Sequence, residues 1–362
     1  MRITCVIGTL GGGGAERMMA CLCAGLAARG HQVTLLTLDD TIPDFYTLPA
    51  SVTRARVHLP TFRTPGLWRG WVRLYKLTRA LWTTRPQVVI SFMTVSVLAS
   101  CLLLRIPYIY ADHLDVRHLA YSRKWQYLRN ILLHFAYCVT VLSYRDKQFL
   151  QERHPSWRTQ VIYNPAPIPP TKSGDRPVCF KTGVKYVLAV GRLTAQKGFD
   201  RLLQAWSSIG PERCGWRLAI VGAGELESAL KAQARELGLT EEVDFIVPQK
   251  DIFALYKHAQ ILAMSSRAEG FPLVLLEAMA SGLPAVSFNC TGPDVIIRHG
   301  LDGLLVPQDR VDLFSAALTE LMKNEVQRLE FSIRAQEVTE RFSIENYLNS
   351  YEALCNQAHL SA

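Results

Sequence analysis

Long apolar runs and paired cysteines are both missing from this chain of 362 residues. Residues 88–104 carry no charge, but this 17-residue stretch is interrupted by serines and favours a buried strand followed by a short helix over a membrane span. The first residues hold too short an apolar run for a secretory signal peptide, so we expect none. The nine cysteines show no Cys-x-x-Cys spacing. They are predicted to be buried thiols in a reducing compartment rather than metal ligands.

Acidic residues are also missing between Asp44 and Asp112, an interval that holds nine lysines and arginines. Residues 1–170 contain 20 Lys and Arg against 8 Asp and Glu, whereas residues 171–362 contain 20 against 23. The net charge of +9 therefore comes from the N-terminal half. Such a basic surface indicates an anionic partner: a membrane, a phosphorylated lipid or a nucleic acid. No recognisable DNA- or RNA-binding module supports the last of these.

Residues 266–284 form the most informative stretch of the sequence. A short apolar strand is predicted before it, at 259–264, and a helix is predicted over 273–281. Pro272 suits the first turn of that helix, where its missing N–H costs nothing. Between strand and helix stands Glu269-Gly270, a carboxylate beside a residue that lets the backbone approach a ligand closely.

Backbone amides at this helix start predict a phosphate cradle. The N–H groups of Gly270, Phe271, Leu273 and Val274 would point out of a helix N-terminus, which favours an anion. Glu277, eight positions after the first acid, is predicted to reach ribose hydroxyls. Backbone N–H donors for a phosphate, together with these two carboxylates, indicate a nucleotide-sugar site. The alternative is that both carboxylates only stabilise the helix dipole.

The N-terminal residues predict a Rossmann-like opening. Strands at 2–8 and 31–38 flank a glycine-rich loop and a helix with apolar residues at helical spacing. The loop reads Gly11-Gly12-Gly13-Gly14-Ala15-Glu16 and departs from Gly-x-Gly-x-x-Gly in a dinucleotide context. Asp39 or Asp40 could be mistaken for an acid that binds the dinucleotide ribose. Dinucleotide binding is therefore the disfavoured alternative.

Residues 67–83 predict a helix with one basic face. At about 100° per residue its four cations fall within about 120° of arc; they are Arg69, Arg73, Lys76 and Arg79. Four aromatic residues flank them: Trp68, Trp71, Tyr75 and Trp82. This pattern is typical of a helix at a membrane surface. A packed helix whose outer face happens to be basic is an equally supported alternative.

A second strand–helix series follows a proline-rich linker at 164–175. Its first strand, 186–190, is followed by Arg192 and Lys197. A diphosphate carries about two negative charges, and paired cations at the end of a strand neutralise them. In the first series His113 also stands at a strand end, where open α/β sheets bind ligands.

The stretch from Glu269 to Glu277, with its Gly-Phe-Pro insert and Ala-Met-Ala-Ser-Gly-Leu-Pro tail, resembles the Glu-x7-Glu signature of the retaining family 4 glycosyltransferases. Gly191-Arg192-Leu193 with Lys197-Gly198 resembles the diphosphate motif of the same family. The resemblance implies an α/β architecture, the GT-B fold, in which two Rossmann-like domains face each other across a cleft. The expected parts are an acceptor-binding domain at 1–165, a nucleotide-sugar-binding domain at 166–342 and a helix at 343–362 that crosses back to the N-terminal domain.

The resemblance also implies roles for individual residues. Arg192 and Lys197 would bind the donor diphosphate, His113 would contact the donor sugar, and Glu269 would hold the sugar hydroxyls and stabilise oxocarbenium-like charge. The glycine-rich loop would face the donor through Gly13 and Gly14, with Glu16 toward the acceptor. Further expected donor contacts are Val247, Gly270, Phe271, Pro272, Leu273 and Glu277. No Asp-x-Asp motif stands in a suitable context, so neither a metal nor a cofactor is expected.

Together with the basic N-terminal half, the resemblance implies a retaining transferase that moves a hexose or N-acetylhexosamine from a nucleotide sugar, expected to be UDP-linked, to a lipid-linked glycan. It resembles transferases that extend lipid-linked oligosaccharides with N-acetylgalactosamine, in the assembly of surface polysaccharide, lipopolysaccharide or glycoprotein glycans. The expected location is the cytoplasmic face of the cell membrane, bound peripherally to anionic lipid. The alternatives are a sugar-nucleotide epimerase of the same fold and a nonenzymatic nucleic-acid-binding protein.

Overall fold

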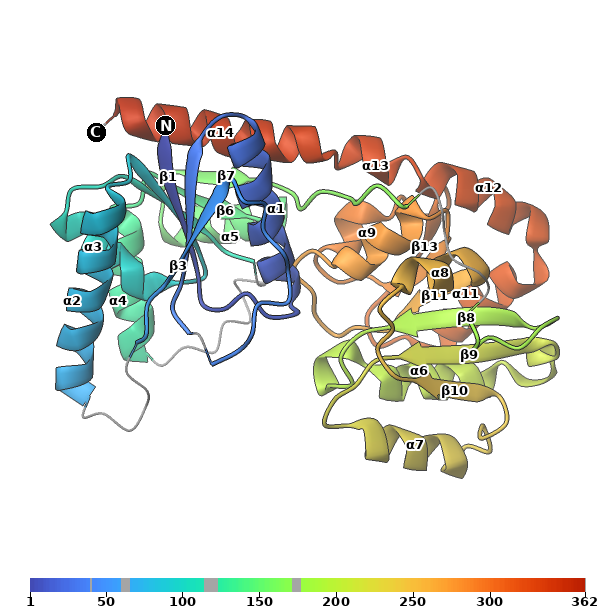
Figure 1. The fold of residues 1–362 in the computed structure, drawn as a ribbon. Coiled ribbons are helices and arrows are strands. Elements are labelled where there is room, and N and C mark those ends of the chain that lie inside the picture. Colours follow the sequence, from blue (N-terminus) through green and yellow to red (C-terminus); the bar gives the residue numbers. More distant parts are fainter. Residues whose placement is uncertain (40, 60–65, 114–122, 171–176, 362) are drawn as a thin grey trace. The chain divides into compact units, whose positions relative to one another are not determined.

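The computed structural model describes residues 1–39, 41–59, 66–113, 123–170 and 177–361 (Figure 1). The chain divides into two compact units, and each is described by itself. Unit 1 comprises Met1–Asn164 together with Glu345–Ala362, and unit 2 comprises Pro165–Ile344. Asp40 and the linker beyond residue 170 lie outside the described residues.

Unit 1 contains a seven-stranded parallel sheet in the order β3-β2-β1-β4-β5-β6-β7. The strands are β1 (Arg2–Ile7), β2 (Gln32–Thr37), β3 (Val52–Arg56), β4 (Val88–Phe92), β5 (Tyr108–Ala111), β6 (Cys138–Val141) and β7 (Thr159–Val161). The helices are α1 (Gly14–Ala28), α2 (Gly66–Thr84), the 3-10 turn η1 (Val95–Val97), α3 (Leu98–Leu103), α4 (Arg123–His134) and α5 (Tyr144–Arg153). This is the doubly wound Rossmann order with one strand added at an edge.

Helices cover both faces of this sheet, because successive strand residues point to opposite sides. Val6 of β1 belongs to a core that also contains buried residues of four helices, α2 to α5: Leu77, Cys101, Leu133 and Leu150. The neighbouring Cys5 points to the other face, where a hydrogen bond with Cys23 of α1 and burial raise the pKa of its thiol. Helices α2 to α5 therefore share one face of the sheet, and α1 lies on the other.

The last helix, α14 (Ile344–Leu360), packs onto unit 1. Its Tyr351 is buried, and the hydroxyl lies 3.3 Å from that of Thr140 on β6. Its Leu348 lies so close to Gly25 of α1 that a Cβ there would stand 2.4 Å from the leucine side chain. The predicted return of the C-terminal helix to the N-terminal domain is confirmed.

Unit 2 contains a six-stranded parallel sheet in the order β10-β9-β8-β11-β12-β13. The strands are β8 (Lys185–Val190), β9 (Trp216–Val221), β10 (Val243–Ile246), β11 (Ile261–Met264), β12 (Ala285–Phe288) and β13 (Gly303–Val306). The helices are α6 (Phe199–Ser208), α7 (Glu227–Glu236), α8 (Ile252–His258), α9 (Leu273–Ala280), α10 (Pro293–Ile296), α11 (Val311–Lys323), α12 (Glu325–Ala335) and α13 (Val338–Arg341), with 3-10 turns η3 (Ala195–Lys197) and η4 (Gly210–Arg213).

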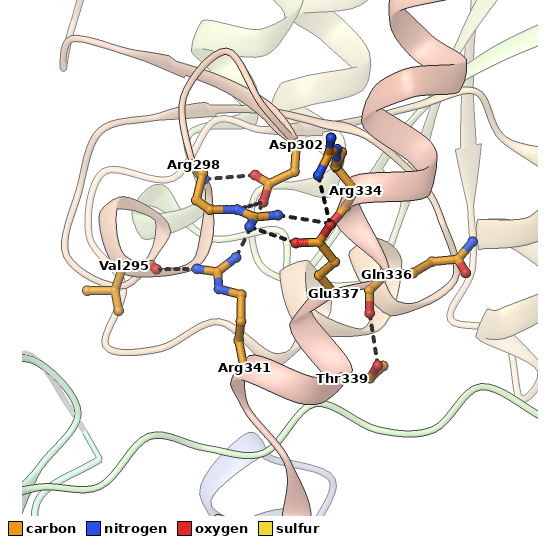
Figure 2. A network of polar contacts seen from close by, with 8 residues as sticks. All are labelled: Val295, Arg298, Asp302, Arg334, Gln336, Glu337, Thr339 and Arg341. Atoms are coloured by element: carbon orange, nitrogen blue, oxygen red, sulfur yellow. Dashed lines mark hydrogen bonds and ion pairs between the residues drawn. The ribbon is translucent and has the colours of Figure 1, made fainter.

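A polar network fixes α12 and α13 of unit 2 to the segment after α10, as Figure 2 shows. The fully buried Asp302 accepts hydrogen bonds from the backbone N and the Nε of Arg298, at 2.7 and 2.6 Å, and pairs with Arg341 at 3.3 Å. Arg341 also donates to the carbonyl of Val295 at 3.1 Å, and Arg298 pairs with Glu337 at 2.7 Å. A buried carboxylate is stable only with such partners, so the network anchors α13, which leads into α14.

The predicted α/β class with two Rossmann-like domains is confirmed. The division of residues 88–104 into a strand and a short helix is confirmed by β4 and α3. The short strands β7, β12 and β13 were not predicted from the sequence.

Candidate active site

The candidate site lies where the strand order of unit 2 reverses. The central strand β8 has β9 on one side and β11 on the other, and the segments that follow β8 and β11 leave the sheet at neighbouring strand ends. In open α/β sheets the crevice beyond these ends is the usual ligand site. The segment 191–198 after β8 carries Arg192 and Lys197, and the segment 265–272 after β11 carries Glu269.

Lys197 and Glu269 form an ion pair that joins these two segments. The Nζ of Lys197 lies 2.6 Å from Oε1 of Glu269, and the two side chains are 17% and 8% exposed. The hydroxyl of Ser266 donates to the same carboxylate oxygen at 2.6 Å, and that of Ser265 donates to the Lys197 carbonyl at 2.9 Å. The carboxylate is therefore held from two sides in the protein without ligand.

Gly198 makes the close approach of the two segments possible. It has a φ of 64°, and a Cβ there would stand 2.2 Å from the carbonyl oxygen of Ser265. Only glycine fits such a position without moving the backbone. Gln196 adds a side-chain hydrogen bond of 2.8 Å to the carbonyl of Ala268, so the segments 191–198 and 265–272 hold each other in place.

Arg192 is exposed and, within the described part of the chain, its side chain makes no hydrogen bond or ion pair. Its backbone is held firmly by the glycine turn after β9. Leu193 donates to the carbonyl of Ala223 at 2.9 Å and accepts from the N–H of Leu226 at 3.0 Å. A Cβ on Gly222 would stand 1.9 Å from the carbonyl oxygen of Gly191, so this turn and the arginine loop are in direct backbone contact.

The start of α9 offers unused backbone donors. Pro272 is the N-cap residue, and the N–H groups of Gly270, Leu273 and Val274 donate to no acceptor among the described residues. Such groups at a helix N-terminus attract phosphate. The Phe271 ring is buried and packs edge-on against Phe342 at 5.3 Å, so the ring is not exposed to a ligand.

Glu277 and Val247, two predicted donor contacts, lie in different surroundings. Glu277 is buried within α9 and accepts a hydrogen bond of 2.8 Å from the hydroxyl of Tyr256 on α8. Val247 follows β10, its side chain is 69% exposed, and its carbonyl accepts from the side chain of Gln249 at 2.9 Å. Tyr256, like Ser266, was not anticipated from the sequence, because neither has a spacing signal of its own.

In unit 1 the predicted glycine-rich loop leads directly into α1. Gly13 is the N-cap residue, Gly14 begins the helix, and Glu16 stands in its first turn. The Glu16 carboxylate folds back over the loop, because a Cβ on Gly13 would stand 2.1 Å from its Oε2. The Gly13 carbonyl accepts from the hydroxyl of Tyr46 at 3.1 Å. A carboxylate here stabilises the positive end of the helix dipole.

His113 follows β5 and stacks on Phe92, with ring centroids 4.1 Å apart. Its Nε2 is buried and has no hydrogen-bond partner among the described residues. Burial lowers the pKa of His113 to about 3, so the imidazole is neutral at physiological pH. The preceding Asp112 forms a buried ion pair of 2.5 Å with Arg129 of α4, which ties this strand end to the helix layer.

The four predicted cations of the helix α2 differ in their surroundings. Arg79 is exposed, whereas Lys76 is half-buried and donates to the carbonyl of His58 at 2.6 Å. Arg73 is half-buried as well. The side chain of Arg69 lies outside the described part of the structure.

Neither a metal centre nor a membrane span is formed by the described residues. No three His, Cys, Asp or Glu side chains in that part of the chain gather closely enough to hold a metal ion. None of its helices combines the length and apolar character required to cross a membrane.

Comparison with known proteins defines the class. Residues 12–168 match the family described as Glycosyltransferase Family 4, and residues 175–338 match the family described as Glycosyl transferases group 1. The amylovoran biosynthesis glycosyltransferase AmsD of Erwinia amylovora is 32% identical over 95% of this chain and 96% of its own length. This chain therefore belongs to the family 4 glycosyltransferases, as predicted.

Other similar proteins span the whole chain as well. The Campylobacter jejuni protein named GalNAc-alpha-(1->4)-GalNAc-alpha-(1->3)-diNAcBac-PP-undecaprenol alpha-1,4-N-acetyl-D-galactosaminyltransferase is 28% identical over 95% of each chain. The sucrose-phosphate synthase from Thermosynechococcus elongatus has a TM-score of 0.83 at 19% identity and 100% coverage of both chains. Anabaena HepE, solved in complex with UDP and glucose, has a TM-score of 0.78 at 19% identity over 99% of this chain and 100% of its own. The predicted GT-B fold is confirmed.

Proposed function

We propose that this glycosyltransferase is a retaining enzyme that moves a hexose or N-acetylhexosamine from a UDP-linked donor to a lipid-linked glycan. The observation that carries the proposal is the Lys197–Glu269 pair next to the Arg192 loop, at the switch point of the sheet in unit 2. Cations for a diphosphate and a carboxylate for a sugar stand there at adjacent strand ends. Anabaena HepE was solved with UDP and glucose, and the name of the Campylobacter relative specifies an undecaprenol-linked acceptor, which supports these two substrate classes.

In the proposed reaction the bond between the anomeric carbon and the UDP oxygen breaks, and the acceptor hydroxyl oxygen forms the new bond on the same face. Negative charge develops on the leaving diphosphate. Arg192, Lys197 and the free N–H groups at the start of α9 stabilise that charge without a metal ion. The acceptor proton passes to a diphosphate oxygen, so atoms and charge balance.

Glu269 has the second role in this proposal. Its carboxylate accepts hydrogen bonds from the sugar hydroxyls and stabilises positive charge on the oxocarbenium-like sugar. The contact with Ser266 fixes the carboxylate in place before the donor arrives, which removes a reorganisation cost from the reaction. Glu277 is proposed to bind the ribose, and the backbone at Val247 the base.

The proposal also assigns roles to residues of unit 1. In this proposal His113 contacts the donor sugar as a neutral imidazole. Gly13 and Gly14 approach the donor through their backbone, and Glu16 faces the acceptor.

The acceptor proposal follows from charge. The acid-free interval between Asp44 and Asp112 favours an anionic, lipid-linked glycan at the cytoplasmic face of a membrane. Peripheral binding to anionic lipid through the cations of α2 is part of this proposal. The product would serve the assembly of a surface polysaccharide, lipopolysaccharide or glycoprotein glycan.

A donor panel with lipid-linked acceptors tests the proposal. The purified chain is incubated with radiolabelled UDP-sugars, and product linkage is assigned by NMR. Arg192→Ala is expected to lower kcat/KM for the preferred donor by about 100-fold, because one charge-assisted contact to the transition state is lost. Arg235→Ala, which removes an exposed arginine in the last turn of α7, is the matched control and should leave transfer unchanged.

Three results would contradict the proposal. Undiminished transfer by Arg192→Ala would show that Arg192 does not bind the diphosphate. A product with the inverted anomeric configuration would show that the enzyme is not retaining. Release of an epimerised nucleotide sugar without transfer would favour the epimerase alternative.

A further inference from the structure

Two segments of unit 1 meet at the carboxyl edge of its sheet, where open α/β sheets bind ligands. Strands β1 and β2 are parallel neighbours, so the glycine-rich loop after β1 and the segment 38–51 after β2 leave the sheet next to each other. The backbone N–H groups of Leu38 and Asp39 both donate to the carbonyl of Gly8 at 3.0 Å. The proposed function assigns a role to the loop but none to the segment 38–51.

This segment places an aromatic ring over the glycine-rich loop. Phe45 is 71% exposed, and its backbone N–H donates to the carbonyl of Leu10 at 2.8 Å. A Cβ on Gly12 would stand between 3.7 and 4.0 Å from three ring atoms of Phe45, so one side of the ring rests on the loop while most of the ring stays exposed. Ile42 is 47% exposed and covers Gly11 in the same way, with its Cγ2 at 3.5 Å from the corresponding Cβ position.

The residues on either side of Phe45 hold its ring in place. The Asp44 carboxylate pairs with Arg54 at 2.9 Å and with Arg56 at 2.8 Å, both on β3. The Tyr46 hydroxyl donates to a carbonyl of the glycine-rich loop at 3.1 Å, and its ring packs edge-on against that of Phe45 with centroids 5.0 Å apart. A single exposed phenylalanine is ordinary, but a ring whose two neighbours are fixed loses little conformational entropy when a ligand covers it.

A pyranose sugar fits this ring and the groups beside it. The C–H bonds of the sugar form an apolar face that stacks on an aromatic ring, while its hydroxyls remain at the rim for polar partners. The Glu16 carboxylate lies against the next residue of the loop, Gly13, and accepts a hydrogen bond of 3.4 Å from the hydroxyl of Thr9. A carboxylate oxygen accepts more than one hydrogen bond. Consecutive residues of one loop therefore support an aromatic face for C–H groups and a carboxylate for hydroxyls.

We propose that Phe45 is the stacking surface for a sugar ring of the acceptor glycan, and hence a residue that determines acceptor specificity. Ile42 extends the apolar surface, and Glu16 accepts hydrogen bonds from hydroxyls of the stacked sugar. The inference rests on the proposed function, which places the acceptor rather than the donor at Glu16. It adds a segment that no sequence motif marks.

Kinetics with a detergent-solubilised, lipid-linked acceptor test this proposal. Phe45→Ala should raise the acceptor KM by about tenfold and change the donor KM and kcat by less than about twofold, because stacking on the acceptor alone is lost. Phe45→Tyr keeps an aromatic face and should keep the wild-type constants. Phe45→Leu is apolar but not flat, and should raise the acceptor KM by about fivefold.

The matched control is Phe135→Ala. It removes a ring that is 58% exposed and stands just before β6, at the amino edge of the same sheet. All three kinetic constants should equal those of wild type. Circular dichroism confirms that each variant is folded.

Saturation-transfer NMR measures the stacking without any sugar transfer. The probes are the methyl glycosides of glucose, of galactose and of their N-acetylamino forms. Irradiation of the aromatic protons of the wild-type protein should saturate the C–H protons on one face of a bound glycoside. This signal should be lost in Phe45→Ala and kept in Phe135→Ala.

Three outcomes would overturn the inference. They are an unchanged acceptor KM in Phe45→Ala, a donor KM that rises as much as the acceptor KM, and saturation transfer that is absent in wild type or equal in Phe45→Ala. The inference and the proposed function fail separately. A wild type that shows saturation transfer dependent on Phe45 but transfers no sugar would refute only the function, whereas active transfer with an unchanged acceptor KM in Phe45→Ala would refute only the inference.

Discussion

The substitution Glu269→Gln should tighten the binding of UDP while it slows sugar transfer. In the free protein the Nζ of Lys197 is already paired with the Glu269 carboxylate at 2.6 Å. The diphosphate must therefore replace that carboxylate before it can use the cation. A glutamine keeps the shape of the side chain and a hydrogen bond with Ser266, but it releases the lysine.

The burial of the pair sets the size of this effect. Exposed ion pairs contribute between about 0 and 1 kcal/mol, whereas breaking a fully buried pair costs about 3–5 kcal/mol. With side chains 17% and 8% exposed, the pair lies between these limits, and most of its energy returns when the lysine pairs with phosphate. We therefore expect a gain of about 1 kcal/mol, which corresponds to about fivefold in Kd.

Isothermal titration with UDP measures this effect in wild type, in both single variants and in Lys197→Met/Glu269→Gln. In the Lys197→Met background the gain from Glu269→Gln should fall below about twofold, because no lysine remains to be released. Transfer should fall by about 100-fold or more in Glu269→Gln. An unchanged or weaker affinity of Glu269→Gln for UDP, or the same fivefold gain in both backgrounds, would refute the reasoning.

Three further predictions concern the rate of transfer, the stability of the protein and the binding of UDP. Ser266→Ala should lower kcat by about fivefold with little change in donor KM, because the Glu269 carboxylate loses one hydrogen bond that fixes its position. Ser266→Thr keeps a hydroxyl at this position and should restore the rate. The pKa of His113 is lowered to about 3, whereas a histidine in an unfolded chain has a pKa of about 6.5, so the unfolded chain binds more protons between these two pH values. The free energy of unfolding should therefore fall as the pH drops below about 6.5, by up to about 1.4 kcal/mol per pH unit. Urea denaturation measures this decrease, which should be smaller in His113→Gln. Gly222→Ala should weaken UDP binding by about tenfold in titration calorimetry, because the new Cβ would collide with the Gly191 carbonyl and move the segment that carries Arg192. The control Gly70→Ala, with open space around its Cβ, should not change UDP binding.

The helix layer of unit 1 shows where sequence patterns stop being informative. The spacing of the cations in α2 was visible in the sequence, and so were the aromatic residues beside them. The apolar surface of α4 was not recognised, because a helix with apolar residues on two sides gives no sign of which side meets the core. Packing of Leu132 and Leu133 against the sheet decides that Leu128 and Ile131 remain outside.

Local sequence was enough to predict the alternation of strands and helices, the glycine turns and the positions of Arg192, Lys197 and Glu269 at strand ends. These features depend on periodicity and backbone freedom, which can be recognised from residues that are close together in the sequence. The folded chain was needed to show that Lys197 and Glu269 are partners, that Ser266 holds the carboxylate and that the turn at Gly222 supports the arginine loop. The contacts between loops join segments about 30 to 70 residues apart, and strand order brings them together because parallel strands place their carboxyl ends at one edge of the sheet.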